Sequence, residues 1–263
     1  MLFRSLDRVD ARDGAVHAWS FVDGEGAWSQ ARSLDREAPR GPLHGVPVGI
    51  KDVIDVAGIP SAYGSAAFAD NIPATDAACV ARLRRAGAVI LGKTVTAEFA
   101  TYHPGPTRNP RDANRTPGGS SSGSAAAVAD CQVPLALGTQ TAGSVIRPAS
   151  FCGIFGFKPS FGRYDIAGML PTAPSLDTLG SFARSVEDIA LLDAVLADEP
   201  VIALPASPRV RIGICCSPAW EQASPDMREA LTAAGVQLGR AGWRVEDLDL
   251  GEAFSQLSAA QAV

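Results

Sequence analysis

Serine side chains gather in two glycine-containing segments near the middle of the chain. Residues 117–124 contain four serines and three glycines. Residues 138–144 end in Ser144 and follow a short apolar run, 133–137, that has the length of a strand. Loops that follow strands often carry catalytic residues, because the strand holds them in place. A serine becomes a nucleophile only when a base takes its proton, so these segments predict serine catalysis with a base elsewhere in the chain.

Two common uses of such loops fit these residues poorly. A Walker-type phosphate loop needs Gly-Lys-Ser/Thr after its glycines, and Ser124-Ala125 stands there instead. Residues 119–123 satisfy the G-x-S-x-G pattern with Ser121 as nucleophile, but an α/β-hydrolase has its histidine after the serine. The chain's histidines are His17, His44 and His103, and all of them precede it. This order disfavours a Ser-His-Asp/Glu hydrolase.

Lysine is the next base available to a serine nucleophile. The chain has three lysines, Lys51, Lys93 and Lys158, against twenty arginines, and each lysine lies beside an apolar, strand-like run. The S-x-x-K pattern of β-lactamases is absent. Taken with the serine segments, Lys51 is the best candidate base, whereas structural roles are expected for Lys93 and Lys158.

Three ordered motifs resemble the amidase signature family. They are residues 49–52, 118–128 and 138–144. Further matches are Asp76, 85–88, 92–100, 151–153 and 157–159. The resemblance extends from about Gly45 to about Leu196, and more weakly beyond. It implies an α/β fold with a central mixed β-sheet covered by helices on both faces, and in this chain a fold that is incomplete at its C-terminal end.

The resemblance also implies a Ser-Ser-Lys triad. Ser144 takes the place of the nucleophile, Ser120 that of a bridging serine held by a cis peptide bond, and Lys51 that of the base. Burial among apolar residues would favour the uncharged amine that a base requires. Ser120 could pass the proton, because a hydroxyl both donates and accepts. The reaction needs no metal and no organic cofactor.

The expected oxyanion donors are the backbone N–H groups of Thr141, Ala142 and Gly143. Ala142 stands where the family usually has glycine, and Gln140 where it more often has Asp. Arg147 lies three residues after Ser144, while the family more often has arginine two residues after. Arg147 could bind a substrate carboxylate or serve helix packing, and the sequence leaves both open. The pattern is closest to that of small-acid, malonamidase-like amidases.

The elements that must position these residues follow an alternating pattern. Residues 45–56 predict a strand that delivers Lys51, residues 76–86 a helix and residues 88–92 a buried strand. Alternation of this kind is typical of an α/β fold. A helix is also expected from Ala125 to Ala129, with the serines before it capping its first turn. Residues 102–117 predict a loop over the site.

The last part of the chain predicts further helices and strands. Helices are expected at 185–198 and 224–241, strands at 209–214 and 243–250, and the start of another helix near Val263. All of these are predicted to form one domain, 1–263, with the preceding elements.

Composition narrows the class of partner. The net charge is −5 with 46% hydrophobic residues, and the chain has neither a basic footprint for nucleic acid nor an apolar run long enough to cross a bilayer. Residues 1–7 carry acid too early for a secretion signal, so a cytoplasmic location is expected. The ligand that the resemblance implies is a small-molecule amide.

The leading hypothesis from the sequence is an amidase that hydrolyses the C–N bond of a linear carboxylic acid amide through an acyl-enzyme. Two alternatives stand beside this first function. The second is a glutaminase A-type subunit of a tRNA-dependent amidotransferase, which works with partner subunits. The third is a truncated, catalytically silent assembly or binding fragment. The family's proteins extend well beyond 263 residues, so a missing C-terminal portion or a homodimer could complete the fold.

Overall fold

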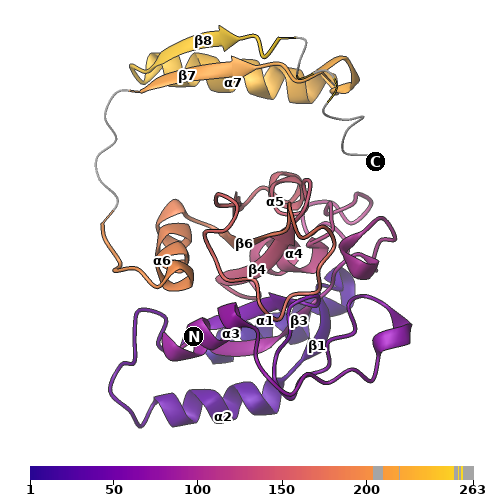
Figure 1. Cartoon of the computed structure of the whole chain (residues 1–263), viewed down its shortest axis with the longest axis vertical. Coiled ribbons are helices and arrows are strands. Elements are labelled where there is room, and N and C mark those ends of the chain that lie inside the picture. The colour runs from indigo at the N-terminus through magenta and orange to yellow at the C-terminus, as the bar shows by residue number, and fades with distance from the viewer. Residues whose placement is uncertain (204–209, 219, 252–253, 255, 257–263) are drawn as a thin grey trace. The chain divides into compact units, whose positions relative to one another are not determined.

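Four segments of the sequence form central strands in the computed structural model (Figure 1). Every residue of these strands is buried. They are β2 (Pro47–Lys51), β3 (Val89–Thr94), β4 (Leu135–Gln140) and β6 (Thr178–Ala183). Strands covered on both faces need apolar residues at nearly every position, which explains their continuous rather than alternating pattern. The structure describes residues 1–203, 210–218, 220–251, 254 and 256.

These strands belong to a six-stranded mixed sheet with the order β1-β3-β2-β4-β6-β5. The edge strands are β1 (Trp19–Val22) and β5 (Phe155–Phe157). Strand β2 lies between β3 and β4 and is parallel to both, whereas β6 is antiparallel to β4. Because parallel strands end at the same edge of a sheet, Lys51 at the end of β2 and the loop after β4 lie at that common edge.

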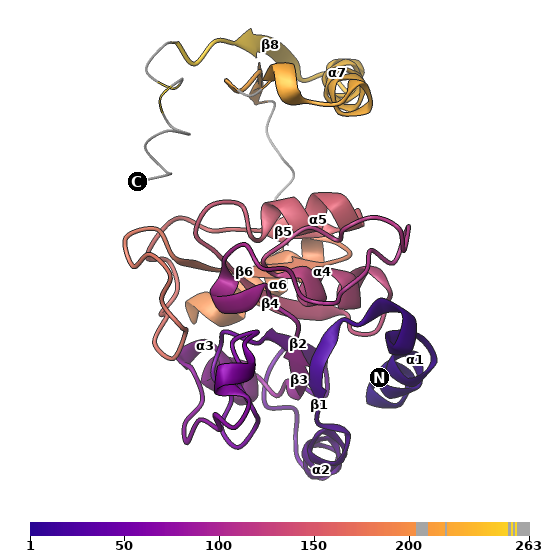
Figure 2. The ribbon, with the colours of Figure 1, turned by 90° about the vertical axis from the view of Figure 1, so that its right-hand side faces the viewer.

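Helices cover both faces of this sheet, as the resemblance implies. Alternate residues of one strand serve opposite faces: Ile90 packs with the cluster that includes Leu83 and Leu192, whereas Leu91 packs with the cluster that includes Ala126. The first face carries α3 (Ala78–Arg85) and α6 (Val186–Ala197). The second carries α1 (Leu2–Val16), α2 (Gly24–Leu34), α4 (Ser122–Ala129) and α5 (Ile146–Cys152), and Figure 2 shows α4 beside α5.

Most predicted elements of this part are confirmed: β2, α3 and α6 are shorter than expected, whereas α4 begins earlier and β3 and β4 end later. The helix expected at 185–198 is α6, and the Ser185 side chain caps it by accepting from the Asp188 N–H. The first two helices and β1 were not among the predicted elements. Helix α1 buries only Leu2, Ser5, Val9 and Val16, so its apolar stripe is too sparse to stand out from a polar segment.

The capping role expected for the serines before α4 is wrong. Ser121 occupies the N-cap position but makes no side-chain capping bond. Its hydroxyl donates to the Thr139 carbonyl, and the Ser122 and Ser124 hydroxyls donate to the carbonyls of Val95 and Leu137. Helix α4 is buried against the sheet, so these hydroxyls bond to the nearest strand-side carbonyls instead of to their own helix.

Contacts divide the chain into two units, Met1–Ala203 and Leu204–Val263. In the second, β7 (Arg211–Cys215) and β8 (Arg244–Leu248) pair in parallel and α7 (Pro225–Arg240) connects them. The expected strand residue Arg209 and most of the helix expected near Val263 lie outside the described residues. One domain over 1–263 stays a prediction. Within the described ranges, no helix is long and apolar enough to cross a membrane.

Two helical glycines give opposite expectations for substitution by alanine. A Cβ at Gly123 of α4 would lie 2.1 Å from the Ala18 carbonyl oxygen, whereas a Cβ at Gly14 of α1 meets nothing within 4 Å. We expect Gly123→Ala to lower the free energy of unfolding by about 1–3 kcal/mol or more through overpacking. Gly14→Ala should raise it by up to about 1 kcal/mol through helix propensity. Urea unfolding measures both, and equal effects would contradict this account of how α4 packs.

Candidate active site

Lys51 is fully buried at the end of β2 and contacts two hydroxyl groups. Its Nζ lies 2.8 Å from Ser120 Oγ and 2.7 Å from Thr139 Oγ1, and the Thr139 carbonyl oxygen is 3.4 Å away. Thr139 belongs to β4, which pairs with β2, while Ser120 comes from the segment that leads into α4. Packing of this segment against β2 and β4 therefore brings together a lysine and a serine that are far apart in the sequence.

Burial also changes the charge preference of this amine. Removal from water lowers the pKa of Lys51 from 10.5 to about 7, and the negative charge of Asp177 opposes part of that shift. A substantial fraction of the amine is therefore uncharged near neutral pH. An uncharged Nζ has a lone pair that can accept a proton, as the predicted base requires.

Ser120 is held by its backbone as well as by Lys51. The Gly119–Ser120 peptide bond is cis, as the resemblance implies. The Ser120 carbonyl accepts a hydrogen bond from the Ala97 N–H at 3.0 Å, and the side chain is almost fully buried. The next residue, Ser121, is the nucleophile of the alternative G-x-S-x-G pattern. Its hydroxyl donates to the Thr139 carbonyl and accepts from the Thr139 N–H.

Ser144 lies half-buried in the loop after β4. Its carbonyl accepts from the Ser121 N–H at 3.3 Å, which brings this loop against the segment that contains Ser120. Among the hydrogen bonds of the described residues, none involves the Ser144 hydroxyl. The structure thus joins Lys51 to Ser120 directly, and Ser144 to the residue that follows Ser120.

The loop that carries the expected oxyanion donors is tied at several points. Thr141 Oγ1 donates to Asp177 Oδ1 at 2.5 Å. The Ala142 carbonyl accepts from Gln140 Nε2 at 2.8 Å, and the Gly143 carbonyl accepts from the Arg147 N–H at 2.9 Å. In the described part of the chain, the N–H groups of Ala142 and Gly143 donate to no protein acceptor. They remain available to a ligand.

The exposed side chain of Arg147 lies over this loop. A Cβ placed on Gly143 would lie 2.8 Å from a terminal nitrogen of the Arg147 guanidinium. Arg147 belongs to α5, whose second residue it is. The guanidinium is therefore close to the expected oxyanion donors, where a substrate carboxylate could reach it.

Three residues that contact the candidate site were given no role from the sequence. Thr139 and Gln140 lie inside the quoted 138–144 motif, so the motif itself was the available signal. Asp177 has no such local signal. It reaches Thr141 because β6 pairs antiparallel with β4, which sets Gln140 opposite Thr178. Its second oxygen accepts the N–H groups of Thr172 and Ala173.

The other two lysines lie apart from this cluster. Lys93 is buried and forms an ion pair with Asp52, 3.3 Å between Nζ and Oδ1, and also donates to Ser61 Oγ. Lys158 donates to the Pro159 carbonyl. The structural roles expected for these two lysines stay predictions.

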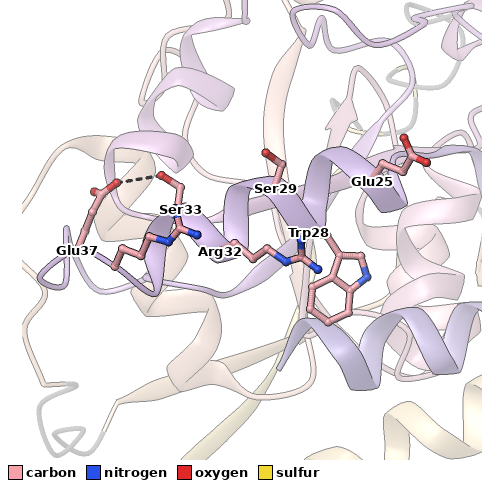
Figure 3. A pocket seen from close by; sticks show the side chains of 7 residues that line it. Glu25, Trp28, Ser29, Arg32, Ser33 and Glu37 are labelled. Atoms are coloured by element: carbon pink, nitrogen blue, oxygen red, sulfur yellow. Dashed lines mark hydrogen bonds between the residues drawn. The ribbon is translucent and has the colours of Figure 1, made fainter.

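A pocket elsewhere on the molecule lies along α2 and the turn after it (Figure 3). Its side chains include Trp28, with the Arg32 guanidinium 5.9 Å from the ring centroid, and Ser33, which donates to Glu37. The remaining lining residues are Glu25, Ser29 and Arg36. None of the candidate catalytic residues contributes to this pocket.

The fold and the site together define a class: mixed α/β proteins with a buried lysine at the carboxyl end of one strand and a serine-bearing loop at the carboxyl end of its parallel neighbour. A family model described as Amidase matches residues 1–262. The chain belongs to the amidase family, whose amidase signature motifs it carries.

Named relatives agree with this membership. The A-type subunit of glutamyl-tRNA(Gln) amidotransferase from Acidothermus cellulolyticus is 48% identical over 202 residues, which cover 73% of this chain and 40% of that protein. The corresponding subunit from Salinispora tropica is 40% identical over 272 aligned residues, which cover 92% of this chain and 55% of that protein. The chain thus spans about half the length of these relatives.

Solved structures show the same fold. The native peptide amidase from Stenotrophomonas maltophilia superposes with a TM-score of 0.86 at 32% identity, covering 99% of this chain and 60% of that one. A crystal structure described as an amidase gives a TM-score of 0.86 at 36% identity, and the match covers 95% of this chain and 59% of that one. The predicted mixed α/β amidase fold is confirmed.

Proposed function

We propose that this chain cleaves amides with Ser144 as nucleophile, Ser120 as proton relay and Lys51 as base. The observation that carries the proposal is the contact of 2.8 Å between a fully buried lysine and Ser120. An uncharged Nζ can accept the Ser120 hydroxyl proton while donating to the two Thr139 oxygens. The support for a relay is the contact of Ser120 with this lysine, together with the hydrogen bond from the Ser121 N–H to the Ser144 carbonyl, which holds the two serine segments together.

The proposed reaction proceeds through an acyl-enzyme. Ser144 Oγ attacks the amide carbonyl as its proton passes to Ser120, whose own proton passes to Lys51 Nζ. Backbone N–H groups of Thr141, Ala142 and Gly143 stabilise the oxyanion. The C–N bond then breaks, and the proton returns through Ser120 to the departing nitrogen. Water next attacks the acyl group, with the same relay as base, and the carboxylic acid leaves.

The pH profile tests the role of Lys51. Because the base must be uncharged, kcat/KM should rise with pH through a midpoint near the Lys51 pKa of about 7 and then level off. The negative charge of Asp177 raises that pKa, so Asp177→Asn should move the midpoint to lower pH.

The matched control for this profile is Asp112→Asn, which removes an exposed carboxylate paired with Arg115. It should leave the midpoint unchanged. A shift to higher pH in Asp177→Asn, or equal shifts in both variants, would contradict Lys51 as the titrating base.

We propose further that the amide is the side chain of glutamine, and that the chain is the glutaminase portion of an A-type amidotransferase subunit. The support is the 48% identity to a subunit of that type, over 73% of this chain. In this proposal the ammonia is used by a partner subunit, so the protein itself need not bind nucleic acid. Ammonia release from glutamine, and its transfer to glutamyl-tRNA when partner subunits are added, tests the assignment.

A second candidate is an amidase for linear amides in general. It is favoured by the superposition on a peptide amidase over 99% of this chain. Faster release of ammonia from peptide or small carboxylic amides than from glutamine, with no transfer to tRNA, would select this function. Absence of any adduct after treatment with a fluorophosphonate would select a catalytically silent fragment instead.

A further inference from the structure

Gln140 makes three hydrogen bonds to the loop that follows it. Its Nε2 donates to the Ala142 carbonyl at 2.8 Å. Its Oε1 accepts from the Val145 N–H at 2.8 Å and from the Ile146 N–H at 3.0 Å. The side chain is buried at the end of β4, so its position is fixed by the sheet. One amide group therefore braces both ends of the turn that contains Gly143 and Ser144.

The bond to Ala142 has a consequence for the next N–H group. Within the described ranges the only cis peptide bond is Gly119–Ser120, so the Ala142–Gly143 bond is trans. In a planar trans peptide the C=O and the following N–H point in opposite directions. Since Gln140 holds the Ala142 oxygen, the Gly143 N–H is directed away from Gln140, and no protein acceptor in the described part of the chain takes it.

We infer that Gln140 is a positioning residue for amide cleavage, because its Nε2 sets the orientation of the Gly143 N–H in the oxyanion loop. This inference rests on the proposed function. It assigns different roles to the oxygen and the nitrogen of the side-chain amide. The oxygen stabilises the start of α5, whereas the NH₂ group orients the peptide that meets the oxyanion. A carboxylate in its place could still accept from Val145 and Ile146 but could not donate to Ala142.

Two variants exploit this separation. Gln140→Glu keeps the acceptors and loses the donor, and Gln140→Met loses both. Gln30→Glu is the control: Gln30 also accepts a backbone N–H, that of Ile90, but it lies on α2 away from the site. The readouts are kcat and KM for amide hydrolysis, the rate of fluorophosphonate reaction at Ser144, and amide hydrogen exchange at Val145 and Ile146.

For Gln140→Glu we expect kcat and the fluorophosphonate rate to fall about a hundredfold, the usual effect of a displaced or lost oxyanion donor. KM should stay within about twofold, and exchange at Val145 and Ile146 should resemble that of the parent. Gln140→Met should show the same loss of rate together with faster exchange at both amides. Gln30→Glu should match the parent in all three measurements.

A wild-type kcat in Gln140→Glu would overturn the inference, because a purely structural glutamine needs only its oxygen. Loss of exchange protection without loss of rate in Gln140→Met would do the same. If the parent itself gives no adduct on Ser144, the proposed function fails. The hydrogen bonds that Gln140 makes to the loop are then tested by amide hydrogen exchange alone, and unchanged exchange at Val145 and Ile146 in Gln140→Met would refute them.

Discussion

Replacing Ser144 with alanine is expected to reduce amide turnover at least about ten-thousandfold, because it removes the only atom proposed to bond to the acyl group. The Ser144 hydroxyl makes no hydrogen bond within the described residues, and the side chain is half-buried. The free energy of unfolding should therefore change by no more than about 0.5 kcal/mol. Ammonia release measures the first effect, and urea unfolding the second.

Ser150→Ala is the matched control for this variant. Ser150 is exposed on α5, a few residues after Ser144, and takes no part in the proposed reaction. It should keep parental turnover and parental labelling by a fluorophosphonate, while Ser144→Ala should lose the adduct as well as the activity. Turnover that survives in Ser144→Ala would refute the nucleophile.

Lys51→Met is expected to have the next largest effect, a loss of about a thousandfold or more in kcat. Methionine fills a similar volume but has no atom that can take the proton from Ser120. Removal of the base alone leaves the oxyanion loop intact, so substrate binding and KM should change little. Lys158→Met is the control, because the Lys158 amine bonds only to the adjoining Pro159 carbonyl in the described structure.

The same variant should also change how stability depends on pH. The pKa of Lys51 is about 7 in the folded protein and near 10.5 when the chain is unfolded, so the unfolded state binds the extra proton between these values. Because of this group, the free energy of unfolding of the parent increases as pH rises from about 7 to about 10.5. Lys51→Met should lack that gain. Identical pH dependence in parent and variant would show that Lys51 is not desolvated as the structure describes.

Much of the architecture could be predicted because its signals are local. The apolar composition of the runs that form β2, β3 and β4 predicts strands. Ser185 and the acidic residues in the first turn predict the start of α6. The serines before α4 show where this approach fails. Their type suggested helix caps, but the partner of a buried hydroxyl depends on which carbonyl the sheet brings near, and sequence spacing does not give that.

The sequence by itself determined the family, the three residues proposed for the triad and the loop proposed for the oxyanion, because these are stretches of specific residues in a fixed order. Only the tertiary structure decided that Lys51 Nζ contacts both Ser120 and Thr139, that Asp177 reaches Thr141, and that Gln140 bonds to both ends of the turn that contains Ser144. These contacts depend on parallel pairing of β2 with β4 and antiparallel pairing of β4 with β6. The lowered pKa of Lys51 has the same origin, since burial is a property of the packed chain and not of any one segment.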